Sequence, residues 1–215
     1  MKLTTRYTLS LFAGLLALAL PVSLSAHDHK DKGKSMDREA MKMKAAQAMK
    51  HDHGSPILPI MYEEIGAIAV LEATEGNDVE GVIRFLPTRS GVRVVGKVTG
   101  LTPGKHGFHI HEYGDRRSAD GTSLGGHYNP TGQPHSGPEN ARRHIGDLGN
   151  IVADEDGVAM VDFTDPLLTF SGPYTILGRG LVVHAGEDDL SSQPTGAAGA
   201  RVAVAVIGVI NPDLD

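Results

Sequence analysis

An all-β domain is predicted from residue 60 to the end of the chain, folded as an antiparallel sandwich or barrel. Short runs rich in Val, Ile and Ala recur there about every ten residues, and Gly, Asn, Asp and Pro separate them. Asp154-Glu155-Asp156-Gly157 has the composition of a hairpin turn. Two connections, 112–147 and 185–199, lack a strand pattern, and loops of that length in a compact domain are usually functional.

Each predicted strand is a run of β-branched and small apolar residues bounded by turn residues. No internal repeat is evident, so these strands are expected to form one domain, residues 60–215. The candidate strands are residues 63–74, 79–87, 91–99, 104–111, 148–153, 157–163, 178–184 and 200–209.

Residues 1–26 have the pattern of a secretory signal peptide. Two basic residues precede the apolar run 7–22, and small residues follow it, so cleavage is expected after Ser25 or Ala26. A retained membrane anchor is the alternative. We therefore expect an exported protein, periplasmic or extracellular, with no stable membrane anchor after cleavage.

Charge and cysteine content exclude several functions. The net charge is −6, and removing the two basic residues of the signal segment makes it −8, which argues against a nucleic-acid partner. The chain has no Cys, so a lipid-anchored lipoprotein and every thiolate metal site are excluded. Any metal must be bound by His and carboxylate side chains.

Residues 27–59 form an extension that differs in composition from the domain. It is rich in His, Met and Lys with few residues that bury surface, so it is expected to be flexible. After cleavage behind Ala26, an amino-terminal copper site is predicted at His29, because a third-position His can complete a square plane around Cu²⁺. The alternative is a solvated linker. Candidate metal ligands of this tail are His27, His29, His51 and His53, with Met36, Met41, Met43 and Met49 as thioether ligands for Cu⁺.

The strongest functional signal is His109-Ile110-His111, in a predicted strand. Side chains at i and i+2 lie on one face of a strand, so two imidazoles are presented together while Phe108 and Ile110 point into the core. Neutral imidazole is the commonest metal ligand in proteins. His106, three residues earlier, faces away and is read as a structural hydrogen-bonding residue.

Five motifs, in order from about Ile65 to Val209, resemble the copper/zinc superoxide dismutases: GFHIHEYGD, GGHYNP, RHIGDLGN, LVVHAGEDDL and GARVAVAVIG. The resemblance implies an eight-stranded antiparallel Greek-key barrel, an immunoglobulin-like sandwich with two long functional loops. It also implies an oxidoreductase that converts superoxide into dioxygen and hydrogen peroxide by a copper redox cycle, with zinc supporting a bridging histidine. The implied copper ligands are His109, His111, His127 and His184, and the implied zinc ligands are His127, His135, His144 and Asp147.

The same resemblance assigns further roles. Asp188 would orient His109 and His135 by hydrogen bonds, and the neighbouring Asp189 is read as solvated. Arg201 would attract and orient superoxide, which makes it a catalytic residue together with the bridging His127. Thr195 would narrow the channel.

Two departures from the family are visible. The positions that match the family's disulfide are Gly121 and Val204, so that bond is absent. The segment from Ser191 to Ala200 is short and uncharged, whereas charged residues of this loop steer the anion in other members. Steering is therefore expected to depend on Arg201 and the metals.

Three other functions compete with this interpretation. A copper-binding or copper-delivery protein on the same barrel is favoured by the His/Met-rich tail, but storage needs no Arg201. A cupin-type metalloenzyme is suggested by the His pair followed by Asp115, but needs none of the zinc ligands. A purely structural β-domain is the third. The resemblance also predicts a homodimer, with ordinary packing at the barrel end as the alternative, through Tyr113-Gly114, Leu177-Gly178 and residues 206–209.

Overall fold

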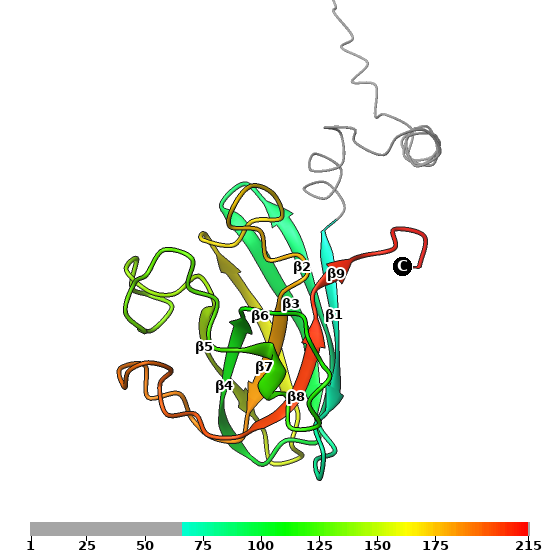
Figure 1. Ribbon diagram of the computed structural model, residues 1–215. Helices are drawn as coiled ribbons and strands as arrows, with labels where there is room; N and C mark the ends of the chain where they lie inside the picture. Colours follow the sequence, from blue (N-terminus) through cyan, green and yellow to red (C-terminus); the bar gives the residue numbers. More distant parts are fainter. Residues whose placement is uncertain (1–65, 215) are drawn as a thin grey trace, which may run out of the picture. The chain divides into compact units, whose positions relative to one another are not determined.

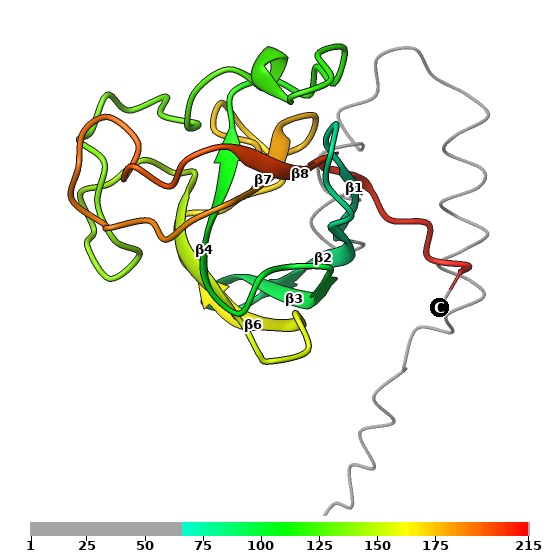
Figure 2. The ribbon, with the colours of Figure 1, turned by 90° about the horizontal axis from the view of Figure 1, so that it is seen from below.

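A computed structural model describes residues 66–214 of the chain (Figure 1; Figure 2). The signal peptide, the extension and the tail copper sites predicted above lie outside the described residues. Within residues 66–214, no helix has the length and hydropathy that a membrane crossing requires.

The described residues contain nine strands and one short 3-10 helix, η1 (Thr122–Leu124). Each predicted strand is present, with ends shifted by a few residues. The predicted strand 200–209 is divided at Ile207: β8 pairs with both β7 and β1, whereas β9 pairs only with β1 among the described strands. The strands are β1 (Ala67–Ala73), β2 (Glu80–Thr88), β3 (Gly91–Thr99), β4 (Gly104–His111), β5 (Asp147–Ala153), β6 (Ala159–Asp165), β7 (Gly180–His184), β8 (Arg201–Val206) and β9 (Gly208–Val209).

The strands close into an antiparallel barrel. The order around it is β2-β3-β6-β5-β4-β7-β8-β1, and β1 pairs back onto β2. β4, β5 and β6 are neighbours in reverse order, while β3 lies beside β6, which is a Greek-key arrangement. The two-residue β9 continues the line of β8 and pairs with the start of β1, so the predicted eight-stranded Greek-key barrel is confirmed.

Side chains from every long strand fill the barrel interior, including the fully buried Phe85, Phe108 and Ile110. On β1, β2 and β6 buried and exposed residues largely alternate, whereas β7 and the second half of β4 are buried on both faces. The reason is visible in Figures 1 and 2, where the loops 112–146 and 185–200 cover the same side of the barrel, next to β4. These loops enclose the candidate site.

Candidate metal centre

β4 presents the two histidines of the sequence motif on the loop-covered side of the barrel. Phe108 and Ile110 belong to the hydrophobic core, while His109 and His111 lie on the other face of the strand and are themselves buried. β7 pairs with β4 on one side and ends at His184, and an isolated β-bridge joins His111 to His127. Strand pairing therefore brings histidines from three parts of the chain together.

The first cluster consists of four buried histidines. The candidate ligand atoms of the group lie within 4.8 Å of one another, and the rings of His109 and His127 have their centroids 4.0 Å apart. The four members are His109, His111, His127 and His184.

One nitrogen of each ring in the first cluster is held in place by a neighbour. Nε2 of His109 donates to Asp188 Oδ2 (2.8 Å), and Nδ1 of His127 contacts Asp147 Oδ1 (2.8 Å). Nδ1 of His111 donates to the carbonyl of Gly125 (2.9 Å), and Nδ1 of His184 to that of Gly199 (3.0 Å).

The second nitrogen of each of these rings is buried and, within residues 66–214, lacks a hydrogen-bond partner: His109 Nδ1, His111 Nε2, His127 Nε2 and His184 Nε2. Buried polar atoms normally have a partner, and each exception requires an explanation. Four convergent imidazole nitrogens are a suitable donor set for copper in both of its common oxidation states. The residues of the first cluster therefore fit a bound copper ion.

The second cluster is built around the carboxylate of Asp147, the first residue of β5. Its Oδ1 lies 2.8 Å from Nδ1 of His127, 2.9 Å from Nδ1 of His135 and 3.1 Å from Nδ1 of His144. Its Oδ2 accepts hydrogen bonds from the backbone N–H groups of Ser136 and His144. Three imidazole nitrogens facing one carboxylate oxygen are a donor set that suits tetrahedral zinc.

His127 belongs to both clusters through different atoms. Its Nδ1 faces the second cluster, and its Nε2 faces the first without a partner among the described residues. A single imidazole can therefore contact two ions at once. No other described residue belongs to both groups.

Burial keeps the histidines of the first cluster neutral. It lowers the pKa of His109 and holds that of His111 well below its usual value. It also lowers the pKa of His127 to about 4 and that of His184 to about 3. Neutral imidazoles have a lone pair available for a metal.

The pKa of Asp147 shifts for a different reason. Burial alone would raise it, but hydrogen bonds from His127 and His144 outweigh this effect and hold it well below its usual range. The carboxylate is therefore ionised at neutral pH, as a metal ligand must be.

Asp188 connects the two clusters from outside. Its side chain is fully buried, and its two oxygens lie 2.8 Å from Nε2 of His109 and 2.9 Å from Nε2 of His135. Burial opposes ionisation, yet the hydrogen bond from His109 helps to lower the pKa of this carboxyl. The adjacent Asp189 is exposed and accepts hydrogen bonds from Ser191 and Ser192.

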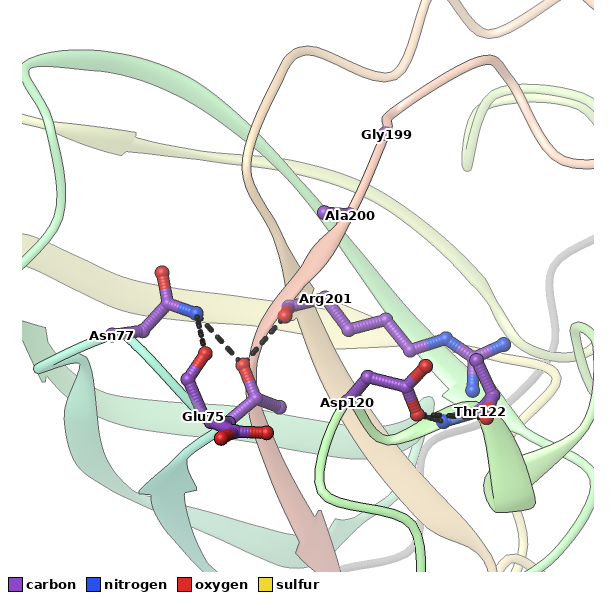
Figure 3. Close-up of a pocket in the computed structure, with 8 residues that line it drawn as sticks. Glu75, Asn77, Asp120, Thr122, Gly199, Ala200 and Arg201 are labelled. Carbon is purple, nitrogen blue, oxygen red and sulfur yellow. Dashed lines mark hydrogen bonds between the residues drawn. The ribbon is translucent and has the colours of Figure 1, made fainter.

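Arg201, the first residue of β8, lines a hollow of about 300 Å³ together with Asp120 and Thr122 of the loop 112–146 (Figure 3). Its guanidinium donates to the carbonyls of Gly121 and Gly125 in the loop 112–146. Gly199, whose carbonyl accepts from His184, lines the same hollow. Burial lowers the pKa of Arg201, and the charge of Asp120 opposes this shift. Thr195 is half-buried and does not line this hollow.

Comparison with known proteins decides the family. The family described as "Copper/zinc superoxide dismutase (SODC)" matches residues 79–207, more than half of the chain. The chain belongs to the copper/zinc superoxide dismutase family. It is thus an oxidoreductase that uses copper and zinc.

Two relatives show how far the similarity extends. The chain is 44% identical over 152 residues to "Extracellular superoxide dismutase [Cu-Zn]" of Brugia pahangi, covering 66% of this chain and 75% of the relative. It is 47% identical over 152 residues to "Superoxide dismutase [Cu-Zn] 2" of Mesembryanthemum crystallinum, covering 67% of this chain and 96% of the relative. These matches exclude the cupin interpretation, and Asp115 pairs with Arg117 rather than joining either cluster.

The two positions that replace the family's disulfide lie against each other. A Cβ added to Gly121 would be 2.8 Å from Cγ1 of Val204. Val204 also packs in a small apolar cluster with Leu124 of η1 and Val182 of β7. This superoxide dismutase therefore attaches its long loop to the barrel by apolar contact and by the Arg201 hydrogen bonds.

The sequence analysis missed one buried residue of the site. Arg143 is 2% exposed and pairs with Asp165 of β6 at 2.6 Å. Its guanidinium also donates to the carbonyls of His144 and Asp147, so it anchors the second cluster to the barrel. Its position beside His144 in the RHIGD motif is a signal that could have identified it. His106 is in neither cluster, and its ring contacts the carbonyls of His184 and Thr102, as its structural interpretation predicted.

Proposed function

We propose that this protein converts two superoxide anions and two protons into dioxygen and hydrogen peroxide, with His127 bridging the two metal ions. Copper would be held by His109, His111, His127 and His184, and zinc by His127, His135, His144 and Asp147. The observation that supports this assignment best is the set of four buried nitrogens without partners, which converge on one point of the first cluster.

Copper supplies one-electron redox chemistry when bound, and zinc supplies a fixed, redox-inert positive charge. The protein's part is to manage protons and position. Nε2 of His127 lies beside the reacting centre, while Nδ1 is committed to the second cluster. Nε2 is therefore the atom at which His127 can hold a proton and later give it to the peroxide product.

Arg201 would bind and orient the anion. Its guanidinium is held by the Gly121 and Gly125 carbonyls, so little side-chain entropy is lost when the anion binds. Thr195 would limit the size of anions that approach. Asp188 would fix the ring orientations of His109 and His135.

The domain division, export and tail function are also part of this proposal. Residues 1–26 would be a signal peptide, 27–59 a copper-collecting extension and 60–215 the catalytic barrel, which would make the protein periplasmic or extracellular. The printed name of the Brugia pahangi relative describes it as extracellular, which supports export. Deleting residues 27–55 would then slow copper loading when copper is scarce and leave the loaded enzyme's kcat unchanged. Equal loading rates would reduce the tail to a linker.

A homodimer is proposed through one end of the barrel. Tyr113 is 56% exposed and Val209 42%, and both belong to the segments that the family resemblance places in the interface. A Cβ on Gly114 would touch the carbonyl of Gly178 and the side chain of Val206, so these three residues of the proposed interface lie against one another. Sedimentation of the Tyr113→Glu variant as a monomer, with the unmodified chain as a dimer, would support it.

The central proposal is tested by elemental analysis and a superoxide-decay assay on protein that lacks residues 1–59. One copper and one zinc per chain, with activity that depends on copper, is the expected result. Zinc alone, with no activity after copper is added, would refute the enzymatic function.

A further inference from the structure

Gln193 makes a reciprocal pair of hydrogen bonds with the backbone of His135. Its Oε1 accepts from the His135 N–H (2.9 Å), and its Nε2 donates to the His135 carbonyl (2.8 Å). A third bond, from Nε2 to the carbonyl of Ser191 (3.1 Å), fixes the amide within its own loop. The side chain thus acts like a strand partner for one residue of the other loop.

His135 needs such a partner because it lies in a segment without regular structure. The residues around it are neither helical nor in a strand, so no backbone ladder satisfies its N–H and C=O groups. His127, the ligand candidate before it, is instead bridged to His111 of β4. Gln193 supplies to His135 what strand pairing supplies to His127.

The amide completes a set of four contacts around one residue. The His135 ring is held at Nδ1 by Asp147 and at Nε2 by Asp188, and its side chain is fully buried. With both backbone groups held by Gln193, neither the ring nor the main chain is free to move. Three of these four contacts, one to Asp188 and two to Gln193, come from the loop 185–200.

We propose that Gln193 is a positioning residue that sets the orientation of His135 and thereby controls how long the second cluster retains its zinc. This inference rests on the proposed assignment of His135 as a zinc ligand. It concerns a residue of the shortened loop that has no ligand atom in either cluster.

The test measures zinc and copper release separately in the metal-loaded full-length protein. Gln193→Ala removes both backbone contacts. Gln193→Glu has the same shape and can accept from the His135 N–H but cannot donate to its carbonyl. The control is Gln133→Ala, in the same loop as His135, whose side chain contacts Thr131 and Arg142 in the described part of the chain.

We expect zinc release to a chelator to be about tenfold faster in Gln193→Ala, equivalent to about 1.4 kcal/mol. Gln193→Glu should fall between this variant and the unmodified protein. Copper release should change less than twofold in all variants. With Co²⁺ in place of zinc, the visible absorption bands should shift in Gln193→Ala and stay unchanged in Gln133→Ala, since they report ligand geometry.

Three results would overturn the inference, and a fourth would refute the ligand assignment on which it rests. If Gln193→Ala releases zinc within twofold of the rate of Gln133→Ala, Gln193 does not control zinc retention. If copper and zinc release accelerate equally, Gln193 contributes only to the general stability of the fold. Unchanged cobalt bands in Gln193→Ala would likewise exclude a positioning role. Failure of the unmodified protein to retain zinc would instead refute the ligand assignment beneath it.

Discussion

The two metal clusters are built in different ways from neighbouring parts of the chain. In the first, His109 and His111 belong to β4 and His184 to β7. In the second, His135 and His144 lie in the loop 112–146, and of its ligands only Asp147 belongs to a strand. One cluster is therefore positioned by the barrel and the other by a loop.

The contacts of the clusters differ in the same way. The first leaves four buried nitrogens without hydrogen-bond partners among the described residues, whereas in the second only Nδ1 of His144 lacks one, and Nδ1 of His127 and of His135 face Oδ1 of Asp147. An unpaired buried polar group costs about 1–3 kcal/mol, so the first cluster, which strand pairing holds in place, carries the larger cost. The first cluster is thus preformed by strand pairing, whereas the second cluster depends on hydrogen bonds and on its metal.

Removing zinc should therefore destabilise the protein more than removing copper. A ligand at a thousand times its Kd stabilises the native state by about 4 kcal/mol. At about 2–4 °C per kcal/mol for a domain of this size, zinc loss should lower Tm by roughly 10 °C and expose residues 128–146 to protease. The measurement is calorimetry and limited proteolysis on two forms of the protein. One form holds copper but no zinc, and the other holds zinc but no copper.

An equal fall of Tm in both forms would contradict the distinction between the clusters. A protease-resistant loop in the metal-free protein would show that packing, including the contact between Gly121 and Val204, holds it without metal.

A second prediction concerns Gly196, whose backbone packs against the side chain of Asp188 within the loop 185–200. A Cβ at this position would lie 1.8 Å from Asp188 Oδ1 and 2.7 Å from Nε2 of His135, and its φ of +70° already disfavours a side chain. Gly196→Ala should destabilise by about 2 kcal/mol, the middle of the range for overpacking. It should also weaken zinc binding more than copper binding. Thermal unfolding and metal analysis test this.

Gly199→Ala is the matched control. Its φ of +82° carries the same backbone strain, but a Cβ there meets no atom within 4 Å. The difference between the two variants isolates the clash with Asp188. Equal destabilisation would mean that backbone strain alone accounts for the effect.

The sequence predicted the barrel and the members of both clusters better than it predicted the contacts between distant parts of the chain. Strand periodicity predicted the His109/His111 pair, and the family resemblance carried by the ordered motifs named the other residues that the structure groups. The pairing of Gln193 with His135 joins residues 58 positions apart through a single side chain, and no periodicity marks it. The division of the last strand at Ile207 likewise depends on its partners, since β8 pairs with both β7 and β1, whereas β9 pairs only with β1 among the described strands.

Substitutions at Arg201, beside the first cluster, should change kcat/KM rather than the order of the loop 112–146. Attraction between Arg201 and an anion about 6 Å away at an effective dielectric near 40 is roughly 1.4 kcal/mol. Arg201→Ala should therefore lower kcat/KM about tenfold. Arg201→Lys keeps the charge but loses the paired bonds to Gly121 and Gly125. If Lys is as slow as Ala, the guanidinium acts by holding the loop and not by attracting the anion.

The smallest effect is expected at Asp120, a loop residue in the same hollow as Arg201 (Figure 3). Its carboxylate accepts from the N–H (2.9 Å) and hydroxyl (2.7 Å) of Thr122, which lowers its pKa and keeps it ionised. Asp120 does not form an ion pair with Arg201 within residues 66–214, so its charge also acts on an approaching anion. Because Asp120 is exposed, water and salt screen this repulsion, and we expect it to change the rate by only about a factor of two.

Asp120→Asn should consequently raise kcat/KM about twofold at low salt and make the rate fall more steeply as salt is added. The unmodified enzyme should show a shallow salt dependence, because the charges of Asp120 and Arg201 oppose each other and the segment 191–200 is uncharged. Asp156→Asn, in the exposed hairpin after β5, removes the same charge far from the hollow and controls for net charge. If both variants accelerate equally, total charge and not the position of Asp120 governs the rate. An unchanged rate in both would mean that the loop carboxylate does not oppose Arg201.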